Sequence, residues 1–234
     1  MTAQVPGAAA LAAMWEAALL LHPIDRALAI ASVFTGEDRS HLAALSIGRR
    51  DTILLEARRT LCGDRIDALC TCEACGEPNE FGLDAAALPC AAAGDEFVTA
   101  EADGRTVRAR LPNSFDLAAL AGRDDLDGAA NDLLARLTPG DVALSAAERS
   151  ALEAAMEARE GLAGLQISFA CSRCETANRV PFDIAAYVWH EIAAHVRSLL
   201  HDTHLLASVY GWTQAEVFAL SPRRRALYVE LVCA

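Results

Sequence analysis

The chain has 234 residues, 53% of them hydrophobic and 22% charged, a composition typical of an ordered protein with a hydrophobic core. This length fits one large domain or two small ones. The 32 Asp and Glu against 20 Lys and Arg give a formal net charge of −12, which argues against nucleic-acid binding, because cationic side chains supply most of the affinity for phosphates.

The most apolar stretch lies near the N-terminus and does not predict a membrane span. Glu16, Pro23 and Arg26 interrupt it before it reaches the length that a bilayer requires. No Lys or Arg precedes the stretch, so it also lacks the charge pattern of a signal peptide. We therefore expect a cytoplasmic protein that contacts no membrane.

Helices are predicted for the N-terminal part of the chain. Two short helices are expected on either side of Pro23: residues 8–21 and residues 24–34. Ser40 can cap a third helix that runs to Gly63, with a break at Gly48.

Two Cys-x-x-Cys pairs are the strongest motifs in the sequence: Cys72 with Cys75, and Cys171 with Cys174. Cytoplasmic cysteines stay reduced, so pairs at this spacing predict a metal site before a disulfide. Each pair places two thiolates on one side of a tight turn, and two facing turns offer the tetrahedral four-sulfur set that structural Zn²⁺ prefers. The flanking segments are predicted strands: residues 64–72, 79–83, 164–171 and 178–182.

An internal repeat supports the pairing of the two turns. A shift of 99 residues superposes four positions without a gap: Cys72 on Cys171, Cys75 on Cys174, Asn79 on Asn178 and Asp84 on Asp183. The copies differ after the second cysteine, where Glu175 replaces Gly76. The two strand–turn–strand units, near residues 64–84 and 164–183, resemble the halves of a zinc ribbon.

The zinc expected here is structural, because four cysteine ligands leave no coordination position open for water. Four buried thiols, or two redox-active pairs, are the alternative interpretations. Cys70 could compete as a ligand, whereas the remaining cysteines are expected to be ordinary small apolar residues: Cys62, Cys90 and Cys233.

The segment between the two Cys-x-x-Cys turns is expected to form a hairpin followed by helices. Residues alternate in polarity on either side of Asp103-Gly104, which predicts a hairpin over residues 96–111. One helix is predicted from about Asp116, and a second follows a Gly- and Asp-rich connection. Ser145 and Glu148 form a capping box for a third helix over residues 146–160.

The expected fold class is α+β: mainly α-helical, with a small β zinc ribbon made of two Cys-x-x-Cys knuckles. The second knuckle returns after the insert, and no low-complexity linker separates the two. We therefore expect residues 1–39 to form an N-terminal helical segment and residues 40–234 to form a single interleaved domain.

A long helix is predicted over residues 183–210, capped by Asp183 and ended by Gly211. A heptad-like apolar seam runs along it: Trp189, Ile192, Val196, Leu199, Thr203, Leu206 and Tyr210. Leu200, Leu205 and Val209 lie off this seam. Such a helix lies centrally in the fold or offers a surface to a partner, and the pattern favours the central position.

The last predicted helix covers residues 221–232 and begins with Ser221-Pro222, a capping residue followed by proline. Arg223, Arg224 and Arg225 occupy its first turn, where the helix dipole disfavours positive charge. Two explanations are open: ion pairs within this acidic chain, or docking to an acidic patch on a partner.

Two histidine patterns resemble catalytic motifs but do not predict an enzyme. A zinc-protease helix needs two histidines four residues apart, whereas His190 and His195 are five apart. His201 and His204 share a helix face that the heptad places on the outside, as expected for solvated polar residues.

The C-terminal part of the chain resembles baseplate hub assembly proteins, or chaperones, of T-even-type phages and related contractile injection systems. The resemblance is carried by FDIAAYVWHEIAAHVRSLL and by the segment after it, LLHDTHLLASVYGWTQAEVFALSPRRRALYVELV. Upstream pieces fit in order: HLAALSIGRRDTILLEARR, the first knuckle, LPNSFDLAAL and the second knuckle. The resemblance covers roughly residues 40–234.

This resemblance implies a non-enzymatic assembly role with baseplate hub or spike proteins as partners. Its most specific parts are the stretches Tyr210-Gly211-Trp212 and Leu220-Ser221-Pro222-Arg223-Arg224. The candidate partner-binding residues are Tyr210, Trp212, Arg223, Arg224 and Arg225. Three other functions stay open, namely a stoichiometric structural baseplate component, a zinc-ribbon nucleic-acid-binding protein and an enzyme. The net charge opposes nucleic-acid binding, and a closed four-thiolate site opposes metal catalysis.

Overall fold

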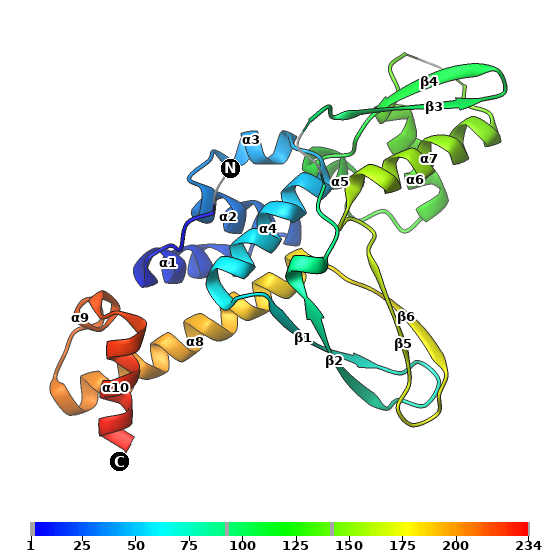
Figure 1. Cartoon of the computed structure of the whole chain (residues 1–234). Coiled ribbons are helices and arrows are strands. Elements are labelled where there is room, and N and C mark those ends of the chain that lie inside the picture. Colours follow the sequence, from blue (N-terminus) through cyan, green and yellow to red (C-terminus); the bar gives the residue numbers. More distant parts are fainter. Residues whose placement is uncertain (1–2, 92–93, 141–142, 234) are drawn as a thin grey trace.

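Over the residues that the structure describes, the fold combines helices with three separate two-stranded antiparallel sheets (Figure 1). A computed structural model describes residues 3–91, 94–140 and 143–233. The helices are α1 (Ala8–Ala18), α2 (Pro23–Thr35), α3 (Arg39–Ala44), α4 (Ile47–Cys62), α5 (Ser114–Leu120), α6 (Leu126–Leu137), α7 (Ala146–Glu160), α8 (Ile184–Tyr210), α9 (Gln214–Ala219) and α10 (Pro222–Cys233), with a 3-10 turn η1 (Ala85–Ala87). The strands are β1 (Arg65–Thr71), β2 (Pro78–Asp84), β3 (Phe97–Ala102), β4 (Arg105–Arg110), β5 (Gln166–Ala170) and β6 (Ala177–Pro181).

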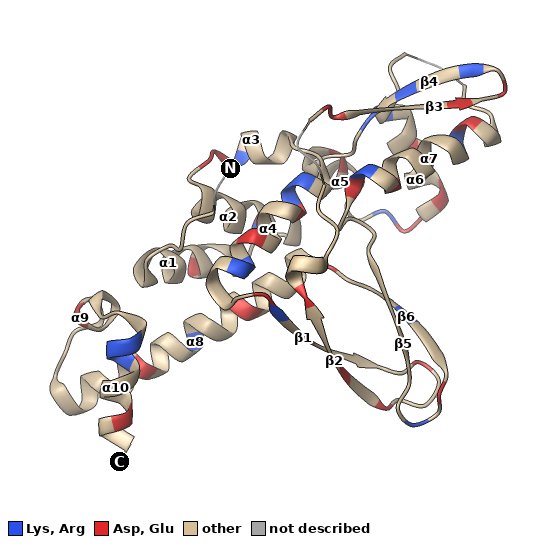
Figure 2. Cartoon of the chain, in the orientation of Figure 1, with Lys and Arg blue, Asp and Glu red and all other residues tan. Residues whose placement is uncertain are grey.

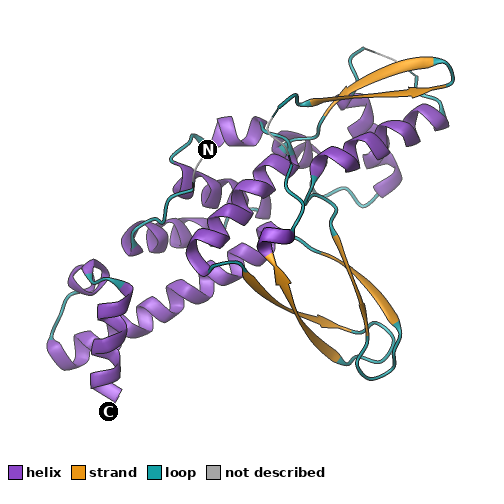
Figure 3. Ribbon diagram, in the orientation of Figure 1, coloured by secondary structure: helices purple, strands orange, loops and turns teal. Residues whose placement is uncertain are grey.

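This arrangement confirms the predicted α+β class with its helical majority (Figure 3). The β1–β2 and β5–β6 hairpins project together from the helices, and the β3–β4 hairpin lies along α7 (Figure 3). None of the helices in the described part of the chain combines the length and hydropathy needed to cross a membrane.

The main hydrophobic core lies between α1, α2, α4 and α8. Its largest fully buried side chains include Leu11, Phe34, Leu54 and Ile192. Complete burial of one such side chain stabilises the fold by about 1.5–3 kcal/mol. The N-terminal helices therefore share one core with α4 and α8, the helices that flank the paired hairpins.

A second, smaller core lies under the β3–β4 hairpin. Val98 and Val107 from the hairpin pack there with Leu134 of α6 and Leu152 of α7. This unit lies between the two Cys-x-x-Cys turns in the sequence. The chain therefore enters this unit from β2 and leaves it into β5.

The predicted helix break at Gly48 is wrong, because the chain leaves the helix at Leu45 and Ser46, between α3 and α4. Ser46 forms an isolated antiparallel bridge with Asn113, and the Ile47 amide donates to the Pro112 carbonyl at 2.9 Å. These tertiary hydrogen bonds compensate for the interrupted helix.

Gly48 instead lies in the first turn of α4, where it permits close packing with α7. A Cβ at this position would collide with the backbone of Glu160, and the Gly48 amide donates to the Glu160 carboxylate. The glycine is therefore required by the approach of two helices and not by a break within one.

Helices α5 and α9 also differ from the sequence prediction. The helix expected from about Asp116 begins at Ser114, because Asn113 caps it and Asp116 completes the capping box. Helix α9 was not predicted, although Thr213 and Glu216 form the same kind of capping box. Its six residues are too few to establish an apolar period.

Helix α8 is buried along most of its apolar seam, as the sequence pattern predicts. Ile192, Val196, Leu199 and Leu206 are each at most 1% exposed. Beyond the core, α8 continues as the support for α9 and α10 (Figure 1). Leu200 and Val209, which lie off the seam, are 40% and 58% exposed.

A buried ion pair connects α4, α8 and the first hairpin. The Arg58 guanidinium is bonded to the Glu191 carboxylate at 2.9 and 3.0 Å and also donates to the carbonyl oxygens of Gly63 and Arg65. Glu191, which stands next to His190 in the rejected protease-like pattern, therefore fixes the end of α4 and the start of β1 against α8.

Candidate metal centre

The β1–β2 and β5–β6 hairpins have the same strand register. Every residue pair between β5 and β6 corresponds to a pair between β1 and β2 after the shift of 99 residues. For example, Phe169 lies opposite Asn178 as Cys70 lies opposite Asn79. The repeat seen in the sequence is thus a repeat of structure, and the tips of both hairpins lie side by side (Figure 1).

The two turns also share their backbone hydrogen bonds. The amides of Cys72 and Cys171 donate to the carbonyls of Glu77 and Thr176, at 2.9 and 3.0 Å. Gly76 and Glu175, each four residues after the first cysteine of its turn, donate back to the Cys72 and Cys171 carbonyls. The two turns close in the same way despite the Gly-to-Glu difference between the copies.

Glu175 adopts the left-handed conformation that the turn requires, with φ of 58° against 72° at Gly76. A side chain with a Cβ pays about 1–2 kcal/mol in this region of backbone space. The second turn therefore carries a local conformational cost that the first turn avoids.

The four sulfur atoms form one cluster in which all lie within 4.8 Å of one another. Cys72 Sγ lies 3.7 Å from Cys174 Sγ, and Cys75 Sγ lies 3.6 Å from Cys171 Sγ. These separations exclude disulfides, in which the sulfurs are about 2.05 Å apart. A tetrahedron with metal–sulfur bonds of about 2.3 Å has edges of about 3.8 Å, so the cluster has the dimensions of a four-thiolate metal site.

Two asparagines connect the turns, each reaching from its own hairpin to the opposite one. Asn79 Nδ2 lies 3.7 Å from Cys171 Sγ, and its Oδ1 accepts from the Ser172 amide at 2.8 Å. Asn178 Nδ2 lies 3.5 Å from Cys72 Sγ, and its Oδ1 accepts from the Glu73 amide. Both side chains are buried, so these contacts lie in a region of low dielectric.

The sequence repeat identified Asn79 and Asn178 as matched positions but gave no indication of this role. Amide groups that donate to sulfur stabilise the thiolate, which is the form that binds metal. The two asparagines therefore connect the two turns, and each donates toward one sulfur of the opposite turn, Cys171 Sγ or Cys72 Sγ.

The backbone of the second turn acts on its cysteines in the same direction. The amides of Cys174 and Arg173 donate toward Cys171 Sγ and lower the pKa of this thiol to about 6. A hydrogen bond with the Thr176 hydroxyl lowers the pKa of Cys174 as well.

The other four cysteines lie outside the cluster. Cys70 is in β1 and is not among the four residues whose sulfurs approach one another. The remaining three are exposed: Cys62, Cys90 and Cys233. None of the three belongs to the sulfur cluster, and none lies in either hydrophobic core.

The candidate partner-binding residues lie at the far end of α8. Tyr210 and Trp212 stack with ring centroids 4.9 Å apart, and Tyr228 of α10 lies edge-on to both rings. These aromatic contacts attach α10 to the end of α8.

The three arginines at the start of α10 do not share one environment. Arg225 is 7% exposed and its Nε donates to Asp202 of α8 at 3.0 Å. This is the intramolecular ion pair that the sequence left open as one explanation. Arg223 and Arg224 are exposed, and the start of α10 carries the colour of basic residues in Figure 2.

The chain matches no family model, no curated protein sequence and no solved structure.

Proposed function

We propose that the four cysteines hold a structural Zn²⁺ ion and that the chain is a cytoplasmic, non-enzymatic assembly factor for the baseplate hub of a contractile phage tail or tail-like injection system. The sulfur cluster and its two bridging asparagines support the metal. The resemblance of residues 40–234 to hub assembly proteins supports the role.

The donor set favours zinc. Four thiolates in a tetrahedral arrangement suit this ion, which has no preference for another geometry and no redox chemistry. All four coordination positions would be filled by protein, so the ion would stabilise the fold without activating water. A site of this kind supplies on the order of 10 kcal/mol of folding free energy.

The position of the site explains why the fold would need it. The two knuckles enclose the insert that carries β3, β4 and helices α5 to α7. The β1–β2 and β5–β6 sheets have only two strands each, and such hairpins are marginally stable in water by themselves. A metal ion between their tips would fix both hairpins and both ends of the insert.

We assign the contact with the hub or spike protein to α10. Arg223 and Arg224 are exposed there, in a chain of net charge −12, so this basic site is suited to an acidic surface of a hub or spike protein. The aromatic cluster of Tyr210, Trp212 and Tyr228 holds α10 against the end of α8.

Affinity purification of the tagged chain from its native host, followed by mass spectrometry, tests this role. We expect hub or spike proteins to co-purify from the soluble pool, and mature tail-like particles to lack the chain. Its presence in purified particles would identify a structural baseplate component instead. Failure to recover either hub proteins or particles would contradict both roles.

A charge-reversal pair provides the matched control. Arg223→Glu with Arg224→Glu is expected to abolish hub capture while leaving the fold intact. Arg39→Glu with Arg179→Glu changes the net charge equally at two other exposed arginines and should leave capture unchanged. Equal loss in both variants would point to a general charge effect and against docking on α10.

A further inference from the structure

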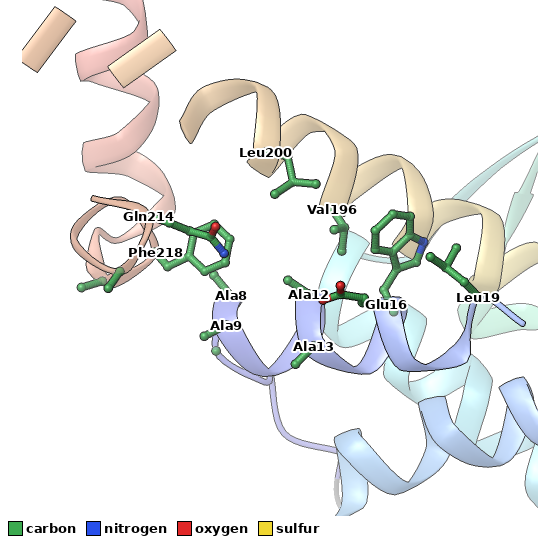
Figure 4. A pocket seen from close by; sticks show the side chains of 14 residues that line it. Ala8, Ala9, Ala12, Ala13, Glu16, Leu19, Val196, Leu200, Gln214 and Phe218 are labelled. Atoms are coloured by element: carbon green, nitrogen blue, oxygen red, sulfur yellow. The ribbon is translucent and has the colours of Figure 1, made fainter. Parts of the chain in front are cut away.

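An open groove lies between α1, α8 and α9, at the side of the main core (Figure 4). Val196 and Leu200 of α8 point into it, and Phe218 of α9 lies across from Ala8 at one end (Figure 4). Its volume is about 890 Å³.

Small residues form most of the wall that α1 contributes to the groove: Ala8, Ala9, Ala12 and Ala13. Alanines on a helix face allow another helix to approach closely, because they leave room for larger side chains from the second helix. The single charged residue of the lining is Glu16. Among the described residues Glu16 has no ion-pair partner.

The chain itself carries a helix face that complements this groove. Arg223, Leu227 and Leu231 recur every four residues on the exposed side of α10. Leu227 is 52% exposed and Leu231 is 68% exposed, whereas most of the other leucines are buried or half-buried. The exposed apolar stripe of α10, with one basic residue at its end, is complementary in shape and charge to the alanine-lined groove with its one acidic residue.

The two surfaces also match in length. Arg223 to Leu231 spans eight residues, or about 12 Å of helix, as does Glu16 to Ala8 on α1. With α10 antiparallel to α1, Arg223 meets Glu16, Leu227 meets Ala12 and Leu231 meets Ala8. Along both helices, the charged residue comes first, and each leucine of α10 then lies opposite an alanine of α1.

The α10 helix cannot fill the groove of its own chain. It is attached to α8 through Asp202, and Asp202 lies about 200° around the helix axis from Leu200, which faces the groove. The Arg225–Asp202 ion pair and the aromatic cluster thus direct the Leu227–Leu231 stripe away from α8.

We infer that the groove between α1, α8 and α9 binds α10 of a second copy of this chain. In the resulting symmetric dimer, α10 of each copy stays attached to its own α8 and docks into the groove of the other copy. Each copy contributes one groove and one helix, and the contact is made twice, as two-fold symmetry requires. This inference does not depend on the hub-assembly role, because its tests need only the purified chain. In such a dimer Arg223 pairs with Glu16 of the other copy, so Arg224 is the arginine of this turn that stays exposed to a further partner.

Sedimentation velocity of the full-length protein over a wide range of concentration tests the dimer. We expect a reversible monomer–dimer equilibrium. Leu227→Asp, at a residue that is already half exposed, should shift it to monomer with an unchanged circular dichroism spectrum. Leu126→Asp is the control, because Leu126 is 79% exposed on α6, which does not line the groove. A protein that stays monomeric at every concentration would overturn the inference and leave the groove to another partner.

Charge exchange between copies makes the test specific to the proposed geometry. Glu16→Arg alone and Arg223→Glu alone each place like charges at both contacts and should weaken the dimer by about tenfold or more. When the two variants are mixed, every contact regains opposite charges, so a heterodimer should form with affinity close to that of the unmodified chain. Mixed variants that remain monomeric would refute the pairing of Glu16 with Arg223, as would a dimer that neither variant weakens.

Discussion

Removal of the Asn79 side chain tests the structural link between the two knuckles. Asn79→Ala deletes its hydrogen bond with the Ser172 amide at 2.8 Å, its bond to the Glu77 carbonyl at 2.8 Å and its contact with Cys171 Sγ. A net loss of about 1 kcal/mol for each of the two full hydrogen bonds and a penalty of about 1–3 kcal/mol for an amide left unpaired add to about 3–5 kcal/mol. Loss of a partner to a metal ligand typically lowers metal affinity by about 10- to 100-fold.

Zinc affinity, measured by competition with a chromophoric chelator, and urea unfolding at fixed free zinc provide the assay. Asn178→Ala should lower stability and zinc affinity in the same way, because Asn178 makes the equivalent contacts in the other hairpin. Asn131→Ala is the control, since Asn131 is exposed on α6. Asn79→Asp keeps the acceptor for Ser172 but replaces the donor to sulfur with a negative charge, so it should weaken zinc binding too. Unchanged zinc affinity and unfolding midpoint in Asn79→Ala would refute this explanation of the site.

Three further changes have defined outcomes. Glu175→Gly removes a side chain from the left-handed region and should raise the unfolding free energy of the zinc-bound protein by about 0.5 kcal/mol; a lower value would contradict the assigned strain. Burial raises the pKa of Glu160 to about 7, above its unfolded value of 4.5, so its protonated form is favoured by folding. The stability that Glu160 contributes is fully present below pH 4.5 and is lost as the pH rises through about 7. The free energy of unfolding in urea should therefore fall by on the order of 1–2 kcal/mol over this pH range, and Glu160→Gln should abolish the fall. An equal change with pH in both proteins would disprove this role of Glu160. Arg225→Ala leaves Asp202 unpaired and should speed amide hydrogen exchange throughout α10, whereas Arg224→Ala should not; similar exchange in the two variants would argue against the ion pair as the anchor.

The cysteine cluster could be predicted from the sequence because its determinants are local. A Cys-x-x-Cys spacing fixes the turn around each pair of thiols, and the shift of 99 residues indicates that Cys72 and Cys171 belong to equivalent units. The caps were predictable for the same reason. Asp183 bonds to an amide of the first turn of α8, and Ser145 with Glu148 closes the capping box of α7.

Features that depend on contacts across the fold could not be predicted in this way. The role of Asn79 depends on Ser172, 93 residues away. Gly48 suggested a helix break because glycine is a poor helix former, but its position is set by the backbone of Glu160. Arg225 could not be distinguished from Arg223 and Arg224 by sequence, because only the packing of α10 on α8 places one of the three beside Asp202.

Native mass spectrometry of the full-length protein, purified without chelators after expression in zinc-replete medium, tests the central claim most directly. The proposed site predicts about one zinc ion per chain, and no zinc with loss of folded hairpins in Cys72→Ser or Cys171→Ser. A well-folded protein that carries no metal, or one that keeps its zinc after both substitutions, would contradict it.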